Sequence, residues 1–281
     1  MDSLTRSKSQ VFAALIRDTF QEARARWLFG GLFALSTLLI AIFLFALKID
    51  LVEGAISIMG IESTKAPLNV TRFVRTSYSI VSAFLYLWGT LLAIFASSGL
   101  IPSVLEAGRI SLLLSKPVTR PVLLLGRYLG NLLVIALNDI YLIGGIWIII
   151  GIKTGIWETR FLLAIPVSLF VFAILLCVVV LIGVLSESAA LSVMVSVALT
   201  LISTVLAQTG FMMRVLDPGW SRHLWMTLYW ILPKVYDLAN QMRQAIVYDR
   251  PSDWWTPVWT SAAFGLVVLW GAIYAFRRRD F

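Results

Sequence analysis

Long runs without a charged residue dominate this chain. Each run is about as long as a bilayer is thick, since a helix needs roughly 20 apolar residues to cross the hydrocarbon. Lipid offers no partner for free backbone N–H and C=O groups, so a crossing segment must be helical or part of a closed barrel. The uncharged runs cover residues 28–47, 76–105, 161–186, 188–213 and 254–276, and residues 128–152 would join them but for Asp139.

The runs predict an all-α, polytopic membrane protein whose 281 residues form a single transmembrane domain. We expect six membrane-spanning helices near residues 27–47, 79–101, 128–151, 161–184, 189–208 and 256–276. The fourth and fifth spans are joined only by Ser186-Glu187-Ser188, which predicts an antiparallel hairpin.

The positions of Lys and Arg residues predict the orientation. Raw totals on the two sides are nearly equal, but basic residues crowd the span ends on the side of the termini. Arg24 and Arg26 precede the first span, and Arg277 to Arg279 follow the last one. We therefore expect both termini in the cytoplasm, with the protein in a bacterial-type plasma (inner) membrane.

Two further segments have the pattern of helices that lie on the membrane. In residues 9–26, apolar residues recur every three or four positions and charged residues occupy most of the positions between them. This pattern predicts a helix in the membrane interface or an ordinary packed amphipathic helix. Within residues 209–255, the stretch 220–233 is rich in Trp and too short to cross. We expect this longer segment to form an extracytoplasmic re-entrant or interfacial region.

Composition excludes several classes of protein. Hydrophobic residues make up 59% and charged residues 14%, with a mean hydropathy of +0.89, which argues against a soluble globular domain. One Cys and one His give neither an intrachain disulfide nor a metal site built from such ligands. The net charge of +8 suits anionic membrane lipids as partners, and we expect no binding of nucleic acid.

The segment between the second and third spans predicts a short helix with firm ends. Pro102 can start a helix, because its missing N–H costs little there, and Pro117 can end one. Leucines can pack between them, while Glu106, Arg109 and Lys116 stay polar. We therefore expect a short cytoplasmic helix at 102–117 that can act as a lever when another protein binds it.

The string EAGRISLLLSKPVTRPVLLLGRYLG, Glu106 to Gly130, resembles the signature of ABC-2 type transporter permeases. The order of the basic amphipathic lead-in, the six spans, the Ile-Leu-Pro at 231–233 and the basic tail is also similar to that family. Within it, the chain is most similar to permeases of nitrous oxide reductase maturation.

The resemblance implies a homodimer or heterodimer of permeases bound to two copies of a separate ATPase, which would bind ATP and Mg. This chain has no G-x-x-x-x-G-K-[ST] phosphate loop, so we expect no cofactor and no enzymatic activity in it. The helix near 102–117 would be the coupling helix. The positions assigned to it are Glu106, Gly108, Arg109, Leu113, Leu114, Ser115, Lys116, Pro117 and Arg120, of which Arg109 departs from the small residue of many relatives.

Asp139 is the one acid inside the predicted spans, about 12 residues past Arg127 and so about 18 Å deep. A charge there is costly unless it is paired, protonated or hydrated, and marks a functional site by default. Asn138 can share a polar cluster with it. The alternative is a structural hydrogen bond to a neighbouring span.

Ser196, Thr200, Ser203 and Thr204 give the fifth span a polar stripe at helical spacing. This stripe either lines a translocation route or bonds one helix to another. The function expected overall is the permease subunit of an ATP-driven exporter. The alternative is a membrane anchor that transmits the motion of an ATPase to an extracytoplasmic partner without moving a solute. An intramembrane enzyme is disfavoured by the few His, Cys and acidic residues.

Overall fold

The structure is a computed structural model that describes residues 27–46, 57–58, 61–62, 70–99, 102, 119–216, 219–248 and 253–278. The interfacial helix expected at 9–26 lies outside these residues. The coupling helix expected at 102–117 also lies outside them, apart from Pro102.

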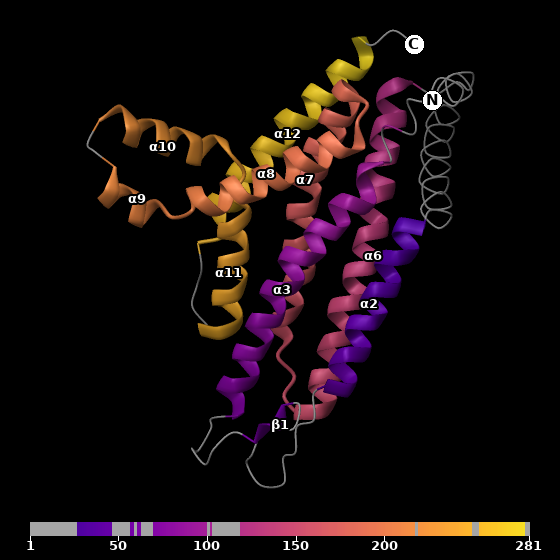
Figure 1. Cartoon of the computed structure of the whole chain (residues 1–281), viewed down its shortest axis with the longest axis vertical. Helices are drawn as coiled ribbons and strands as arrows, with labels where there is room; N and C mark the ends of the chain where they lie inside the picture. Colours follow the sequence, from indigo (N-terminus) through magenta and orange to yellow (C-terminus); the bar gives the residue numbers. More distant parts are fainter. Residues whose placement is uncertain are drawn as a thin grey trace, which may run out of the picture.

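Long helices pack along one another in an elongated bundle (Figure 1). These are α2 (Trp27–Ala46), α3 (Val70–Ser98), α6 (Arg120–Thr154), α7 (Ala164–Ser186), α8 (Ala189–Leu206) and α12 (Trp255–Arg278). A short 3-10 helix, η1 (Thr159–Leu163), precedes α7. The strands β1 (Ser57–Ile58) and β2 (Ile61–Glu62) pair antiparallel below the bundle in the view of Figure 1.

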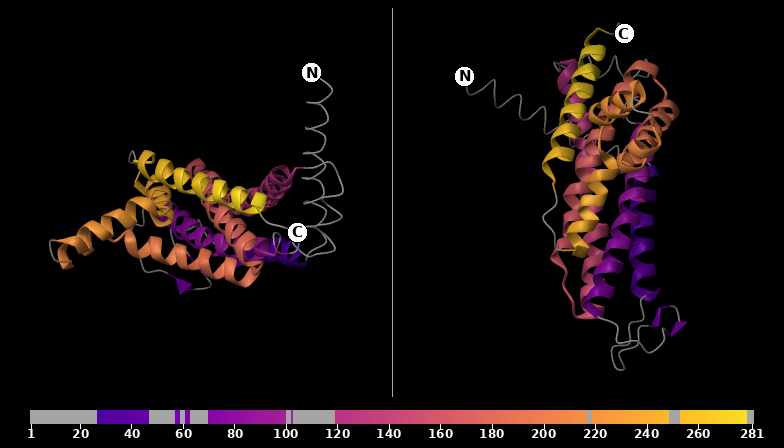
Figure 2. Two further views of the ribbon diagram at one scale, coloured as in Figure 1. Left: turned by 90° about the horizontal axis from the view of Figure 1, so that it is seen from above. Right: turned by 90° about the vertical axis from the view of Figure 1, so that its left-hand side faces the viewer.

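Three shorter helices connect α8 to α12. They are α9 (Thr209–Val215), α10 (Trp220–Ile231) and α11 (Val235–Tyr248). Helices α9 and α10 project sideways from the bundle, whereas α11 lies along it (Figures 1 and 2). The segment predicted to be re-entrant or interfacial is thus helical, and part of it stands away from the core.

Within the described residues, five helices are long and apolar enough to cross a membrane. They cover Val74–Ser98, Arg120–Thr154, Thr159–Ser186, Ala189–Leu206 and Trp255–Arg278. In α2, the stretch Gly30–Phe45 is a shorter apolar helix. The predominantly helical class is therefore confirmed for the described part of the chain, with five helices as candidates for crossing a membrane. The count of six spans stays a prediction.

Helix α7 forms the centre of the bundle and packs against α3, α6, α8 and α12. A helix that is apolar on all sides is expected at such a position. Val171, Phe172, Leu175 and Val179 are all fully buried.

The turn between α7 and α8 forms the predicted hairpin. Glu187 ends α7 in the left-handed conformation, with φ at 54° and its N–H bonded to the Gly183 carbonyl at 3.1 Å. Ser188 then begins α8, and its hydroxyl accepts a hydrogen bond from the Leu191 N–H at 3.3 Å.

Two helices begin earlier than predicted. Helix α6 begins at Arg120 rather than at residue 128, with a proline in its first turn, and α3 begins at Val70 rather than at residue 79. Charged residues mark the end of an apolar run, but they do not stop a helix. At about 1.5 Å per residue, the 35 residues of α6 extend roughly 52 Å, which exceeds the hydrocarbon thickness of about 30 Å.

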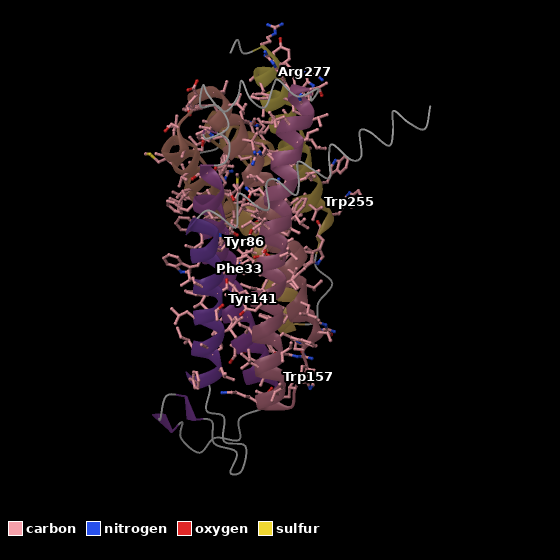
Figure 3. All side chains as sticks on the ribbon, turned by 90° about the vertical axis from the view of Figure 1, so that its right-hand side faces the viewer. Phe33, Tyr86, Tyr141, Trp157, Trp255 and Arg277 are labelled. Carbon is pink, nitrogen blue, oxygen red and sulfur yellow. The ribbon has the colours of Figure 1, made fainter. Side chains whose placement is uncertain are left out.

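The two ends of the bundle differ in the residues they carry. Arg277 lies at one end and Trp157 at the other (Figure 3), so the two are called the Arg277 end and the Trp157 end. Helix α2 occupies the half toward the Trp157 end, and α12 the half toward the Arg277 end (Figure 1).

Candidate functional site

The predicted coupling segment is attached to the Arg277 end of the bundle. Arg120, the first residue of α6, donates a hydrogen bond from Nη1 to the Arg277 carbonyl at 3.2 Å. Ser97, near the end of α3, donates from Oγ to Asn131 Oδ1 of α6 at 3.1 Å. The chain therefore leaves α3 and enters α6 at this end. Of the residues assigned to coupling, Arg120 alone lies in the described ranges.

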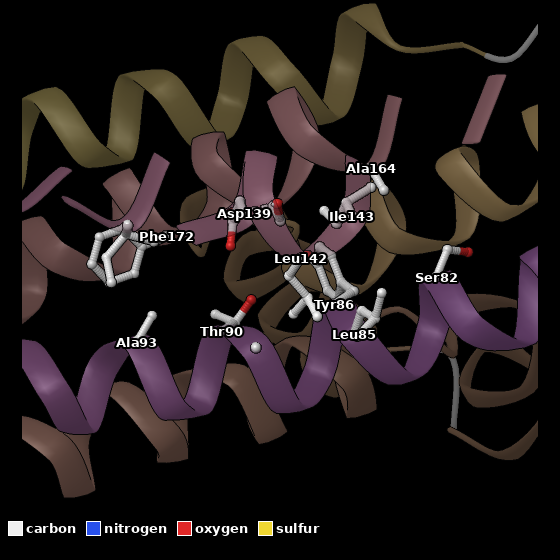
Figure 4. Close-up of a pocket in the computed structure, with 13 residues that line it drawn as sticks. Ser82, Leu85, Tyr86, Thr90, Ala93, Asp139, Leu142, Ile143, Ala164 and Phe172 are labelled. Carbon is white, nitrogen blue, oxygen red and sulfur yellow. Dashed lines mark hydrogen bonds between the residues drawn. The ribbon is translucent and has the colours of Figure 1, made fainter. Parts of the chain in front are cut away.

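Asp139 faces a cavity between α3, α6 and α7 (Figure 4). Its Oδ2 accepts a hydrogen bond from Ser168 Oγ of α7 at 2.8 Å. A hydrogen bond to a neighbouring span was one of the two expectations for this residue. The other expectation, a functional role for Asp139, is compatible with the cavity that its side chain faces.

Asn138 does not join Asp139 in one cluster, contrary to the expectation. Successive helical residues point about 100° apart, so the two side chains meet different neighbours. Asn138 Oδ1 accepts from Ser36 Oγ of α2 at 3.0 Å, and both side chains are buried. This residue therefore fastens α2 to α6.

The polar stripe of α8 is buried in the bundle except for the half-buried Thr204, and it is largely satisfied within its own helix. The hydroxyls of Ser196, Thr200 and Thr204 donate to the carbonyls of the residues four positions earlier, at 2.9 to 3.0 Å. This arrangement favours helix packing over a translocation route, because the hydroxyl hydrogens already have acceptors.

Ser203 differs from the rest of the stripe, since its Oγ accepts a hydrogen bond from the Tyr236 N–H at 3.3 Å. The first turn of α11 is held by two other helices too. Ser261 Oγ of α12 accepts from the Lys234 N–H at 2.9 Å, and Tyr86 of α3 donates to the Val235 carbonyl. Hydroxyls from α8 and α12 thus satisfy N–H groups that every helix start leaves unpaired.

Lys234 has a buried side chain, which the sequence did not single out. Its Nζ donates to the Tyr229 carbonyl at 3.1 Å and to Thr260 Oγ1 at 3.2 Å. It also lies 4.4 Å and 4.6 Å from the ring centroids of Tyr229 and Trp230. Burial lowers the pKa of Lys234 below its ordinary 10.5, against the attraction of Asp237.

Asp237 receives a hydrogen bond from the Tyr229 hydroxyl at 2.8 Å. Burial raises the pKa of Asp237, while this hydrogen bond and the charge of Lys234 act in the opposite direction. Burial also raises the pKa of Tyr229, and the hydrogen bond to Asp237 adds to the effect. In the sequence, Lys234 directly follows Pro233 at the end of an apolar run, and Asp237 lies three residues later. That position was the signal by which the two residues could have been found.

An ion pair lies toward the Trp157 end. Arg75 Nε of α3 is 2.8 Å from Glu158 Oε2, and the Glu158 side chain is 10% exposed. The Trp147 indole donates to the Glu158 carbonyl at 3.1 Å. These contacts join the start of α3 to the connection between α6 and α7, and their residues lie outside the predicted polar candidates.

Among the described residues, no group of three His, Cys, Asp or Glu side chains is placed to hold a metal ion. No protein-family model matches the chain, and no curated protein matches its sequence. The functional assignment therefore rests on the residues themselves.

Proposed function

We propose that this chain is the membrane subunit of an ATP-driven exporter and couples hydrolysis by a separate ATPase to movement of a substrate across the membrane. The observation that carries the proposal is the Glu106–Gly130 string, with its acidic residue, its run of leucines and the Ser-Lys-Pro-Val-Thr-Arg that follows them. Five helices suited to crossing a membrane give the setting that such a subunit requires.

The attachment of this segment supports a mechanical role. It lies between α3 and α6, both of which pack against the central α7. Helix α6 runs without interruption from Arg120 to Thr154. A push on the segment would therefore tilt a long rigid helix, because displacement at one end of a continuous helix is transmitted along its length.

In this proposal two ATPase copies bind ATP and Mg, and each grips one segment of a permease dimer from the cytoplasm of a bacterial-type plasma membrane. Basic residues at the Arg277 end agree with a cytoplasmic location, since Arg277 and Arg278 close α12. The termini would lie on the same side.

The proposal is tested with the full-length chain carrying an affinity tag. The tagged chain is purified from membranes of the source cells, and a co-purifying protein with a phosphate-loop motif is identified by mass spectrometry. Its ATPase rate is then measured alone and with the chain in vesicles. We expect the chain to change that rate, and Leu113→Asp to abolish the change while reaching the membrane at the normal level.

Lys153→Ala is the matched control, because Lys153 bonds to the Leu44 carbonyl toward the Trp157 end, away from the segment. This variant should behave as the wild type. The proposal fails if no such ATPase co-purifies, or if the hydrolysis rate is the same with and without the chain.

A second candidate is the transmission of ATPase motion to an extracytoplasmic partner. The projecting pair α9 and α10 favours it, because α10 has no buried residue and exposes Trp220, Leu224 and Trp230. Inside-out vesicles given a small-molecule extract of the source cells separate the two functions. ATP-dependent accumulation of a solute supports the exporter. ATPase activity that depends on the chain, without any accumulation, supports the transmitter.

A further inference from the structure

The cavity that Asp139 faces is small and is lined by three helices. It has a volume of about 20 Å³, and its walls include Tyr86 and Thr90 of α3, Asp139 of α6, and Ser168 and Phe172 of α7. A cavity of this size holds about one particle as large as a water molecule. An organic substrate does not fit there.

Thr90 has a hydroxyl that is set apart from the others in the bundle. Its side chain is 5% exposed, and its Oγ1 has no hydrogen-bond partner among the described residues. The hydroxyls of Thr154, Thr200 and Thr204 instead donate to carbonyls of their own helices. Figure 4 shows Thr90 and Asp139 pointing toward one another across the space between α3 and α6. A buried hydroxyl without a partner is costly, so a ligand in the cavity is expected.

Two other hydroxyls that line the cavity use their hydrogens elsewhere. The Ser168 hydroxyl donates to Asp139 Oδ2, and the Tyr86 hydroxyl donates to the Val235 carbonyl. Their hydrogens are therefore committed, and their lone pairs remain. Within the described residues, no Lys or Arg side chain forms an ion pair with Asp139. A carboxylate that shares a largely apolar cavity with hydroxyl oxygens attracts a cation.

We propose that this cavity binds one Na⁺ ion through the Asp139 carboxylate, Thr90 Oγ1 and Ser168 Oγ. Hard cations take oxygen ligands, and the groups that meet here are all of that kind. A monovalent ion fits the charge, because one carboxylate neutralises it, whereas a divalent ion would leave a net positive charge in an apolar bundle. The site does not depend on the proposed ATPase partner.

The test is equilibrium binding of radioactive sodium to the purified full-length chain in nanodiscs, with choline chloride holding the ionic strength constant. The wild type should bind one ion per chain, saturably, and unlabelled NaCl should displace it. Asp139→Asn should weaken binding at least about tenfold, since it removes the charge. Thr90→Val keeps the shape of the side chain and removes a ligand, so it should also weaken binding.

Ser98→Ala is the matched control on α3, because the Ser98 hydroxyl donates to the Phe95 carbonyl of its own helix. It should bind sodium as the wild type does. Saturable binding that both Asp139→Asn and Thr90→Val reduce supports the site. A folded wild type without saturable binding overturns it, as does unchanged affinity in either variant. If Asp139→Asn fails to fold, Thr90→Val decides the question.

Discussion

Arg120 and Arg277 are 157 residues apart in the chain, and the guanidinium of Arg120 donates a hydrogen bond to the Arg277 carbonyl at 3.2 Å. The bond joins the start of α6 to the last turn of α12. A carbonyl at a helix end has no partner within the helix, and a cation there is favourable. Any displacement of the segment before Arg120 would therefore reach α12 as well as α6.

Arg120→Ala tests this link. We expect the ATPase rate that depends on the chain to fall about tenfold, while the free energy of unfolding changes by less than about 1 kcal/mol, because the bond is exposed. ATPase assays in vesicles and thermal melting in detergent measure the two quantities. Normal coupling in Arg120→Ala would mean that this bond plays no part in transmission.

Ser203 and Ser196 form a matched pair on α8, since both are buried. Ser203→Ala leaves the Tyr236 N–H without its acceptor, so we expect a loss of about 1–2 kcal/mol. Ser196→Ala removes only a bond to its own helix, and we expect less than about 0.5 kcal/mol. Melting temperatures of the two variants compare them. Equal losses, or a specific transport defect in Ser196→Ala at normal stability, would favour a translocation route along the stripe.

The ion pair of Arg75 and Glu158 is suited to a double-mutant cycle. Arg75→Ala leaves a mostly buried carboxylate without its partner, so we expect a loss of about 1–3 kcal/mol. The variant lacking both charged groups should lose less than the sum of the single variants. Strict additivity of the melting shifts would show that the pair contributes no coupling.

Lys234 should give stability a dependence on alkaline pH. Its pKa is lowered in the folded state, so the unfolded chain binds more protons between that lowered value and the ordinary 10.5. The free energy of unfolding therefore rises with pH in this window. The melting temperature of the wild type should rise relative to Lys234→Met as the pH is raised toward 10.0, the ordinary pKa at which Tyr229 of the unfolded chain also titrates. A difference that stays constant or shrinks with pH would contradict this.

The apolar pattern was sufficient to predict the helical class and the approximate place of each long helix, because uncharged runs of about 20 residues have the length of a membrane-spanning helix and exceed that of a barrel strand. It did not predict that α6 begins at Arg120. A run without charged residues indicates which part of a helix can lie in the hydrocarbon, and the helix itself continues beyond that part. It found Asp139, the one acid inside a predicted span. Partners of a side chain depend on tertiary packing, so the sequence indicated neither Ser168 for Asp139 nor Ser36 for Asn138.

Lys234 shows the limit of counting apolar residues. In the sequence it directly follows Pro233 at the end of the Trp-rich stretch 220–233, and nothing in that pattern indicates burial. In the structure its stem is buried and its ammonium group lies against Tyr229 and Trp230. Only the packing of α10 against α12 creates that site.

The proposed function requires that residues 102–117 are bound from the cytoplasm, so the decisive measurement is the accessibility of residue 116. Lys116→Cys is made in a Cys177→Ser background, which removes the one native cysteine. Intact cells and inside-out vesicles are then treated with a membrane-impermeant maleimide. We expect labelling in the vesicles and none in intact cells, with protection when the ATPase is bound. Labelling of residue 116 from outside intact cells would contradict it.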